Sequence, residues 1–202
     1  MKKVIGNIYK IFEEFDKKDI DGFLTKCKLN NNIFSKKYSE SSFYEINISG
    51  NKINIYDRTY FLDDKEECSL KLNQNEKIIF DCINTTQSDG FKREESLKRI
   101  IYKKYKIIPF FVLRLLGGYV IEMQKTIYKN IIFLKIDLYY DFIEENKKFK
   151  NLIIGRVSSY FYFFYISYIY NEDLNKIYGK CSKKTVRKKY LGFSILEEFG
   201  IK

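Results

Sequence analysis

The sequence contains no histidine, and this absence excludes several kinds of chemistry. Without an imidazole group the chain cannot build a Ser-His-Asp or Cys-His catalytic site, a histidine-liganded metal centre or a histidine pH switch. Alanine and tryptophan are also absent, and Pro109 is the only proline. Their places are taken by Lys, Asn, Ile, Tyr and Phe, whose codons are rich in A and T. This usage indicates an A/T-rich genome.

Cysteine is sparse and widely spaced. The chain has four cysteines with no Cys-x-x-Cys pair among them: Cys27, Cys68, Cys82 and Cys181. A four-cysteine zinc site normally contains two such close pairs, so this spacing argues against zinc. We expect four reduced thiols in a cytoplasmic protein. No signal peptide is visible, and the most apolar stretch, residues 152–170, includes Arg156, so we expect no membrane span.

Motifs for phosphate binding and for metal-dependent catalysis are weak or missing. Gly117-Gly118 lacks the rest of a P-loop, and neither Gly-x-Gly-x-x-Gly nor Glu-x-Glu occurs. Asp137 and Asp141 lie four residues apart; on a strand, both carboxylates would point to one face and could bind Mg²⁺. We therefore expect a protein that is not an enzyme and has no cofactor. A Mg²⁺-dependent enzyme that processes nucleic acid is the alternative.

The first hundred residues show two helical patterns followed by β-forming runs. Apolar residues at helical spacing predict N-terminal helices over residues 3–16 and 20–27. Runs of β-formers at 43–49 and 52–60 flank Gly50-Asn51 and predict a hairpin. Residues 68–72 and 77–83 are predicted as two further strands, joined by a polar turn.

The second half continues with one helix, several strands and a helical C-terminus. A central amphipathic helix is predicted over 93–106, with Pro109 marking its end. The predicted strands are 119–125, 130–139, 152–157 and 160–170, although a buried helix also fits the last of these. A short basic helix is predicted over 183–190, anchored by Val186 and Tyr190. Ser194 and Glu197 form a capping-box pattern for a final turn with Ile195, Leu196 and Phe199 inside.

Together these elements predict an α+β fold. It would contain N-terminal helices, a mostly antiparallel β-sheet of about six to eight strands, a central amphipathic helix and a short C-terminal basic helix. We expect one globular domain over residues 1–202, with a subdivision near 88–108 as the alternative.

Positive charge is concentrated in the second half of the chain. Residues 1–100 hold 18 basic and 17 acidic residues, a net charge of +1, whereas residues 101–202 hold 19 and 9, a net charge of +10. Codon bias explains the abundance of lysine but not this uneven placement. The predicted RNA-binding residues form a dense cluster and a second group on the central helix: Lys180, Lys183, Lys184, Arg187, Lys188, Lys189, Lys98, Arg99, Lys103 and Lys104.

A basic face of this kind favours a polyanionic partner. Lysine contacts phosphate as a point charge, so we expect recognition of an RNA backbone and its shape rather than of bases. Ribosomal RNA is the expected partner, with ribosomal proteins as additional contacts. The protein could occupy a functional site and silence idle ribosomes. The other alternative is an interaction module whose basic face docks an acidic protein or an anionic membrane.

Overall fold

The computed structural model describes residues 8–29, 43–57, 66–118, 120–166 and 190–201. The chain divides into two compact units, Met1–Phe111 and Val112–Lys202, which we call unit 1 and unit 2. The expectation of a single globular domain, with a subdivision near 88–108 as the alternative, stays a prediction.

Unit 1 begins with helical residues 8–11, which lie within the predicted helix 3–16, and with α2 (Lys17–Lys26). The helix predicted over 20–27 is thus confirmed as α2, which begins three residues earlier. Cys27 follows α2 and forms a disulfide with Cys68, with a Cα–Cα distance of 5.1 Å. The expectation of four reduced thiols is therefore wrong for this pair, while Cys82 is a free, buried thiol.

The predicted hairpin is present as β1 (Phe43–Ile48) paired antiparallel with β2 (Asn51–Tyr56). Ser49 and Gly50 form its two-residue turn with φ of +49° and +81°. Positive φ at both positions is the mirror-image turn that matches strand twist. The turn lies one residue earlier than the Gly50-Asn51 position predicted.

The strands predicted at 68–72 and 77–83 are wrong, because these residues belong to α3 (Glu66–Ser69) and α4 (Gln74–Asn84) or join them. Asn73 caps α4: its Oδ1 accepts from the Glu76 backbone N–H at 2.9 Å. Glu76 Oε2 in turn accepts from the Asn73 N–H at 2.7 Å. The polar run predicted as a turn is therefore a capping box, which starts a helix.

The central helix is present as α5 (Gly90–Ile100) but ends earlier than predicted. Its N-terminus is capped by Asp89, whose carboxylate accepts from the backbone N–H groups of Phe91 and Lys92. Pro109 does not end this helix. It lies in the first turn of α6 (Ile108–Leu116), where the missing N–H of proline breaks no helical hydrogen bond.

Every regular element that the structure describes in unit 2 is a helix. It contains α7 (Ile121–Asn130), a 3₁₀ turn η2 (Ile131–Phe133), α8 (Ile136–Glu145), α9 (Lys147–Tyr160), a π-helical stretch η3 (Phe161–Ile166) and α13 (Leu191–Glu198). The strands predicted at 119–125, 130–139, 152–157 and 160–170 are wrong wherever the structure describes them. Buried residues on α9 recur four apart, at Phe149, Ile153 and Val157, which is the spacing of one helix face.

The C-terminal prediction is confirmed in part. Ile195, Leu196 and Phe199 are buried as expected, but α13 begins at Leu191, so Ser194 does not cap it. The short basic helix predicted over 183–190 lies outside the described residues except for Tyr190, which is buried and precedes α13.

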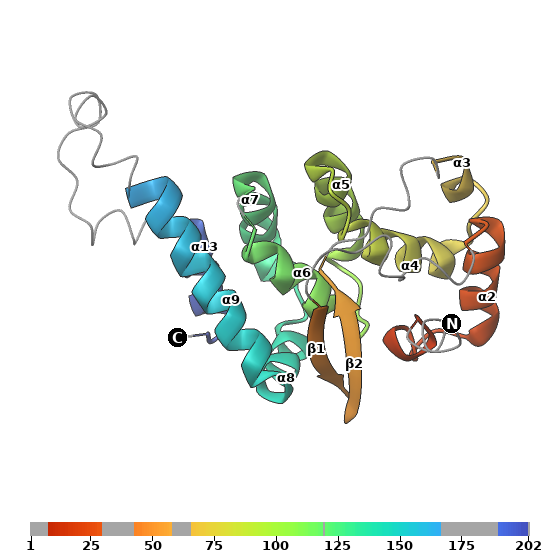
Figure 1. The fold of residues 1–202 in the computed structure, drawn as a ribbon, viewed down its shortest axis with the longest axis horizontal. Coiled ribbons are helices and arrows are strands. Elements are labelled where there is room, and N and C mark those ends of the chain that lie inside the picture. The colour runs from red at the N-terminus through yellow and green to blue at the C-terminus, as the bar shows by residue number, and fades with distance from the viewer. Residues whose placement is uncertain (1–7, 30–42, 58–65, 119, 167–189, 202) are drawn as a thin grey trace. The chain divides into compact units, whose positions relative to one another are not determined.

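The predicted α+β class, with about six to eight strands, is therefore wrong. The structure is mainly helical, and the β1–β2 hairpin is the only sheet among the described residues (Figure 1). Aromatic and β-branched residues suggested strands, but they pack here as the apolar faces of helices. No helix in the described part of the chain is both long and apolar enough to cross a membrane.

Candidate functional site

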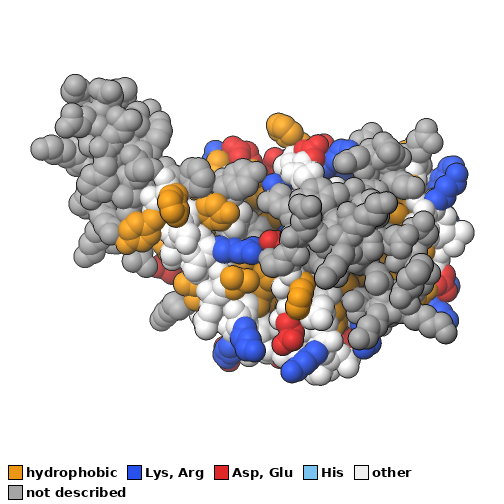
Figure 2. All heavy atoms as spheres, in the orientation of Figure 1, with side chains coloured by type: hydrophobic (Ala, Val, Ile, Leu, Met, Phe, Trp, Pro, Cys, Tyr) orange, Lys and Arg blue, Asp and Glu red, His pale blue; other side chains and the backbone are white. Residues whose placement is uncertain are grey.

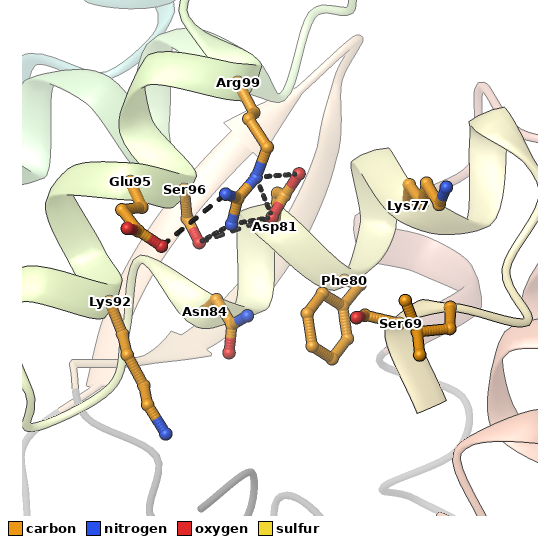
Figure 3. A pocket seen from close by; sticks show the side chains of 10 residues that line it. Ser69, Lys77, Phe80, Asp81, Asn84, Lys92, Glu95, Ser96 and Arg99 are labelled. Atoms are coloured by element: carbon orange, nitrogen blue, oxygen red, sulfur yellow. Dashed lines mark hydrogen bonds and ion pairs between the residues drawn. The ribbon is translucent and has the colours of Figure 1, made fainter. Parts of the chain in front are cut away.

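A cavity of about 690 Å³ opens in unit 1 beside α4. Its walls come from α4, from α5 and from the end of α3 with the turn after it (Figure 3). The lining combines apolar, amide, acidic and basic side chains: Ser69, Leu70, Lys77, Phe80, Asp81, Asn84, Lys92, Glu95, Ser96 and Arg99. A volume of this size lies within the range of small-molecule binding sites.

Arg99 is held in one orientation at this cavity. Its Nε donates to both carboxylate oxygens of Asp81, at 2.9 and 3.0 Å, and its Nη2 lies 2.9 Å from Asp81 Oδ1. Nη2 also donates to Ser96 Oγ at 3.2 Å, and the Ser96 hydroxyl lies 3.3 Å from Asp81 Oδ1 (Figure 3). This network joins α4 to α5 and fixes the plane of the guanidinium group.

The fixed guanidinium group has donors left over. Arg99 Nη1 lies 3.8 Å from Glu95 Oε2, which is too far for a hydrogen bond. The N–H groups of Nη1 can therefore donate to an added anion. Asp81 is buried, and burial raises its pKa, while the hydrogen bonds and charge of Arg99 act in the opposite direction. The site thus positions a cation, and the Ser96 hydroxyl is held by the same network.

Asn84 places a side-chain amide at the cavity, and no side-chain hydrogen bond of this residue occurs in the described structure. The residue is 93% buried, since only 7% of its surface is exposed. Its side chain points into the cavity, towards the space that the ring of Phe80 also faces (Figure 3). An asparagine amide both donates and accepts hydrogen bonds. The amide atoms are not among the buried side-chain atoms that lack a partner, so they open on the cavity, where a ligand or water can bind them.

The four predicted binding residues that the structure describes differ in their surroundings. Lys98 Nζ lies 2.7 Å from Glu94 Oε1, one turn earlier on α5, and Arg99 pairs with Asp81. Lys103 and Lys104 follow the end of α5, and no carboxylate in the described residues pairs with either. The remaining predicted residues lie outside the described residues: Lys180, Lys183, Lys184, Arg187, Lys188 and Lys189.

Basic side chains do not gather into one patch on the face drawn in Figure 2. Blue basic groups there are dispersed, and several lie beside red acidic groups. This agrees with the ion pairs of Lys98 and Arg99.

The acidic candidates for Mg²⁺ binding occupy a helix rather than a strand. Asp137 and Asp141 are exposed on α8, so the strand placement is wrong. Among the described residues, no group of three or more His, Cys, Asp or Glu side chains is placed to hold a metal ion. That the chain is not an enzyme stays a prediction.

Sequence reasoning missed the cavity, although its residues carry a spacing signal. Lys77, Asp81 and Asn84 recur at intervals of four and three on α4. Lys92, Ser96 and Arg99 recur at the same intervals on α5. Each set lies on one face of its helix. Recognising Asn73 and Asp89 as N-caps would have predicted where α4 and α5 begin. The residues on one face of each helix could then have been identified.

Comparisons with known proteins identify no relative of this chain. No family model, no curated protein and no solved structure matches this chain.

Proposed function

We propose that the chain is a non-catalytic RNA-binding protein that contacts the phosphate backbone through residues 92–106. This segment holds seven basic and two acidic residues, a net charge of +5. The other residues of unit 1 hold 14 basic and 15 acidic residues, a net charge of −1. This concentration of positive charge in one segment of unit 1 is the observation that carries the proposal, because a segment with net positive charge attracts phosphate groups.

The ion pairs in this segment are compatible with phosphate binding. The side chains of Lys98 and Arg99 are 55% and 52% exposed. Exposed ion pairs contribute about 1 kcal/mol or less, so a phosphate group can compete with the carboxylate of Glu94 for Lys98. Lys103 and Lys104 need no such exchange, since no described carboxylate pairs with them. Six further basic residues in segment 180–189 would supply phosphate contacts of their own.

Ribosomal RNA is the partner that we propose, with ribosomal proteins as additional contacts. A folded RNA of that size offers a dense phosphate surface, which suits recognition by lysine without base reading. In its most specific form, the proposal is a factor that occupies a functional site and silences idle ribosomes.

The first test is the double variant Lys103→Gln/Lys104→Gln, with Lys125→Gln/Lys129→Gln on α7 as its control. Both variants remove two positive charges, and the control removes them from exposed positions outside the segment. Binding to single-stranded RNA should weaken only in the first variant. The slope of log affinity against log salt should become shallower by roughly 1.4, at about 0.7 per phosphate contact. Equal slopes in the two variants would contradict the proposed surface.

The second test addresses segment 180–189 and the ribosomal partner. Replacing Lys183, Lys184, Arg187, Lys188 and Lys189 by glutamine should abolish binding without unfolding the protein. In native extracts the protein should sediment with ribosomes at low salt and be released at high salt. A protein that stays in the soluble fraction at low salt is not ribosome-associated.

A further inference from the structure

We propose that the cavity between α4 and α5 binds a single nucleotide, with the base inside and the phosphate at the basic rim. The inference rests on the proposed function for the source of that nucleotide, which would be one unstacked unit of an RNA strand. Arg99 connects the cavity with the proposed RNA-binding surface, since it lines the cavity and belongs to segment 92–106.

The inner part of the cavity suits a planar base. The Phe80 ring and Leu70 provide apolar surface, and the side chain of Leu70 is exposed. A base presents a flat apolar face together with hydrogen-bonding groups along its edge. Packing of that face against Leu70 and the small exposed part of Phe80 would remove apolar surface from water.

Asn84 supplies the hydrogen bonds for the edge of the base. Its amide points into the cavity, and it has no hydrogen-bond partner among the described residues (Figure 3). An amide can donate and accept at the same time, as the edge of a base requires. A purely apolar ligand would cover this amide without replacing its contact with water, which costs free energy.

The rim supplies charge for a phosphate group. Lys77, Lys92 and Arg99 line the cavity with Asp81 and Glu95, so the lining has one more positive than negative charge. Asp81 is already bound to Arg99 and is buried, which leaves Nη1 of Arg99 and the ammonium group of Lys77 to meet an anion. A nucleotide matches this arrangement, whereas an uncharged nucleoside lacks the anionic group.

The test uses the full chain, labelled for NMR, with three probes. These are the ribonucleoside 5′-monophosphates, the corresponding nucleosides and inorganic phosphate. Nucleoside monophosphates should shift the amide signals of α4 and α5 around the cavity. Nucleosides and inorganic phosphate should bind more weakly, because each satisfies only one half of the site. Absence of any shift around the cavity with the monophosphates overturns the inference.

Asn84→Ala provides the decisive variant, with Asn151→Ala as its control. Asn84 makes no side-chain hydrogen bond in the described protein, so the variant should fold, and Asn151 is an exposed asparagine on α9. We expect roughly tenfold weaker binding of the monophosphates to Asn84→Ala, with the weak binding of inorganic phosphate unchanged. The control should bind like the wild type. Equal affinity of both variants for the monophosphates overturns the inference.

The same experiment separates this inference from the proposed function. RNA binding that is lost in Lys103→Gln/Lys104→Gln but unchanged in Asn84→Ala, without monophosphate binding, leaves the proposed function standing and removes the nucleotide site. Monophosphate binding at the cavity without binding of RNA strands keeps the nucleotide site and removes the proposed function. A free nucleotide would then be the ligand.

Discussion

Unit 1 buries three carboxylates and unit 2, in its described residues, buries none. Asp19, Glu76 and Asp81 of unit 1 are each less than 9% exposed, whereas every described acidic residue of unit 2 is exposed. A charge leaves water only where partners compensate it. The interior of unit 1 must therefore contain partners for its three carboxylates, which the interior of unit 2 does not need. Both units have apolar cores, but only unit 1 buries carboxylates between its helices, whereas the charged residue buried in the described part of unit 2 is Arg114.

The polar contacts of unit 1 place α4 against its neighbours on both sides. Glu76 on α4 accepts from Lys26 Nζ of α2 at 2.7 and 2.6 Å. Asp19 on α2 accepts from Asn73 and Asn75, at the start of α4, at 3.0 and 2.8 Å. Asp81 binds Arg99 on the other neighbour, α5. The carboxylates are buried, whereas the side chains of Lys26 and Arg99 are 37% and 52% exposed, so solvent screens these pairs in part while they position α4.

The packing of unit 2 is aromatic. Phe161 lies 5.5 Å from the ring of Tyr190 and 5.2 Å from that of Phe193, measured between centroids. Tyr139 stacks on Phe199 at 4.7 Å. Burial raises the pKa of Tyr139, whose hydroxyl has no hydrogen-bond partner in the described residues. This ring therefore contributes by packing alone.

The largest effect is expected from Phe161→Ala in unit 2. The side chain is 1% exposed, and its loss leaves a cavity against Tyr190 and Phe193. The free energy of unfolding should fall by about 3–5 kcal/mol. Hydrogen exchange should show the loss in α9 and α13, and the loss should be nearly the same in low and high salt because no charge is involved. A strong salt dependence would contradict the apolar description of unit 2.

Reduction of the Cys27–Cys68 disulfide should have the next largest effect, in unit 1. The bond joins residues 41 positions apart, and chain entropy assigns about 4 kcal/mol to a loop of that length. The variant Cys27→Ser/Cys68→Ser should unfold at lower denaturant concentration than the oxidised protein and should not respond to added reductant. Cys82→Ser serves as the control, since that free thiol should leave the response to reductant intact.

Local signals in the sequence were sufficient for part of the fold. The hairpin and α2 depend on spacing and turn residues within a few positions, and both were predicted. The inward face of α13 was predicted for the same reason. The helices of unit 2 were missed because A/T-rich usage fills every element with Ile, Tyr and Phe. These residues favour strands by propensity, so propensity did not distinguish helices from strands in this chain. The four-residue spacing of Phe149, Ile153 and Val157 does indicate a helix.

The candidate site was harder to predict for a different reason. The basic residues of α5 can be found by counting charge, and Arg99 was named on that basis. Asn84 and Phe80 carry no charge and belong to a segment predicted as a strand. Even with α4 recognised as a helix, its packing against α5 is a tertiary contact that no local pattern supplies. Only that contact turns two helix faces into a cavity.

A smaller effect of definite sign is expected from Gly22→Ala in unit 1. A Cβ atom at Gly22 would lie 2.2 Å from Glu76 Oε1, and this carboxylate is held by Lys26 and by the Asn73 N–H. Alanine normally stabilises a helix by about 1 kcal/mol relative to glycine. Here the clash should outweigh that gain and lower the free energy of unfolding by about 1–3 kcal/mol.

Gly155→Ala on α9 is the matched control for this change. A Cβ atom there meets nothing within 4 Å, so helix propensity alone should act and stabilise unit 2 by about 1 kcal/mol. Denaturant unfolding of the two variants should therefore show opposite signs. Stabilisation by both would mean that α2 does not approach Glu76 as closely as described.

The smallest effect is the pH dependence that Asp81 gives to unit 1. Burial raises the pKa of Asp81 in the folded protein above its unfolded value of about 3.9. The folded state therefore binds the proton more tightly, and this contribution to stability is complete below the unfolded pKa and is lost as pH rises through the folded pKa. Asp19 acts in the opposite sense. Hydrogen bonds from Asn75 and Asn73 lower its pKa, so its contribution is present above the unfolded pKa and is lost as pH falls through the folded pKa.

Titration of the Asp81 carboxyl carbon by NMR separates the two contributions. Arg99 holds the pKa of Asp81 down by hydrogen bonding and by charge, so Arg99→Gln should raise it further. Asp81→Asn should remove the part of the stability that declines with rising pH, and hydrogen exchange in α4 and α5 should report the change. The helix α9 should respond less, because the described acidic residues of unit 2 are all exposed. A pKa of Asp81 that falls in Arg99→Gln would show that Arg99 does not compensate this carboxylate. The Asp81–Arg99 contact between α4 and α5 would then not stabilise unit 1 as described.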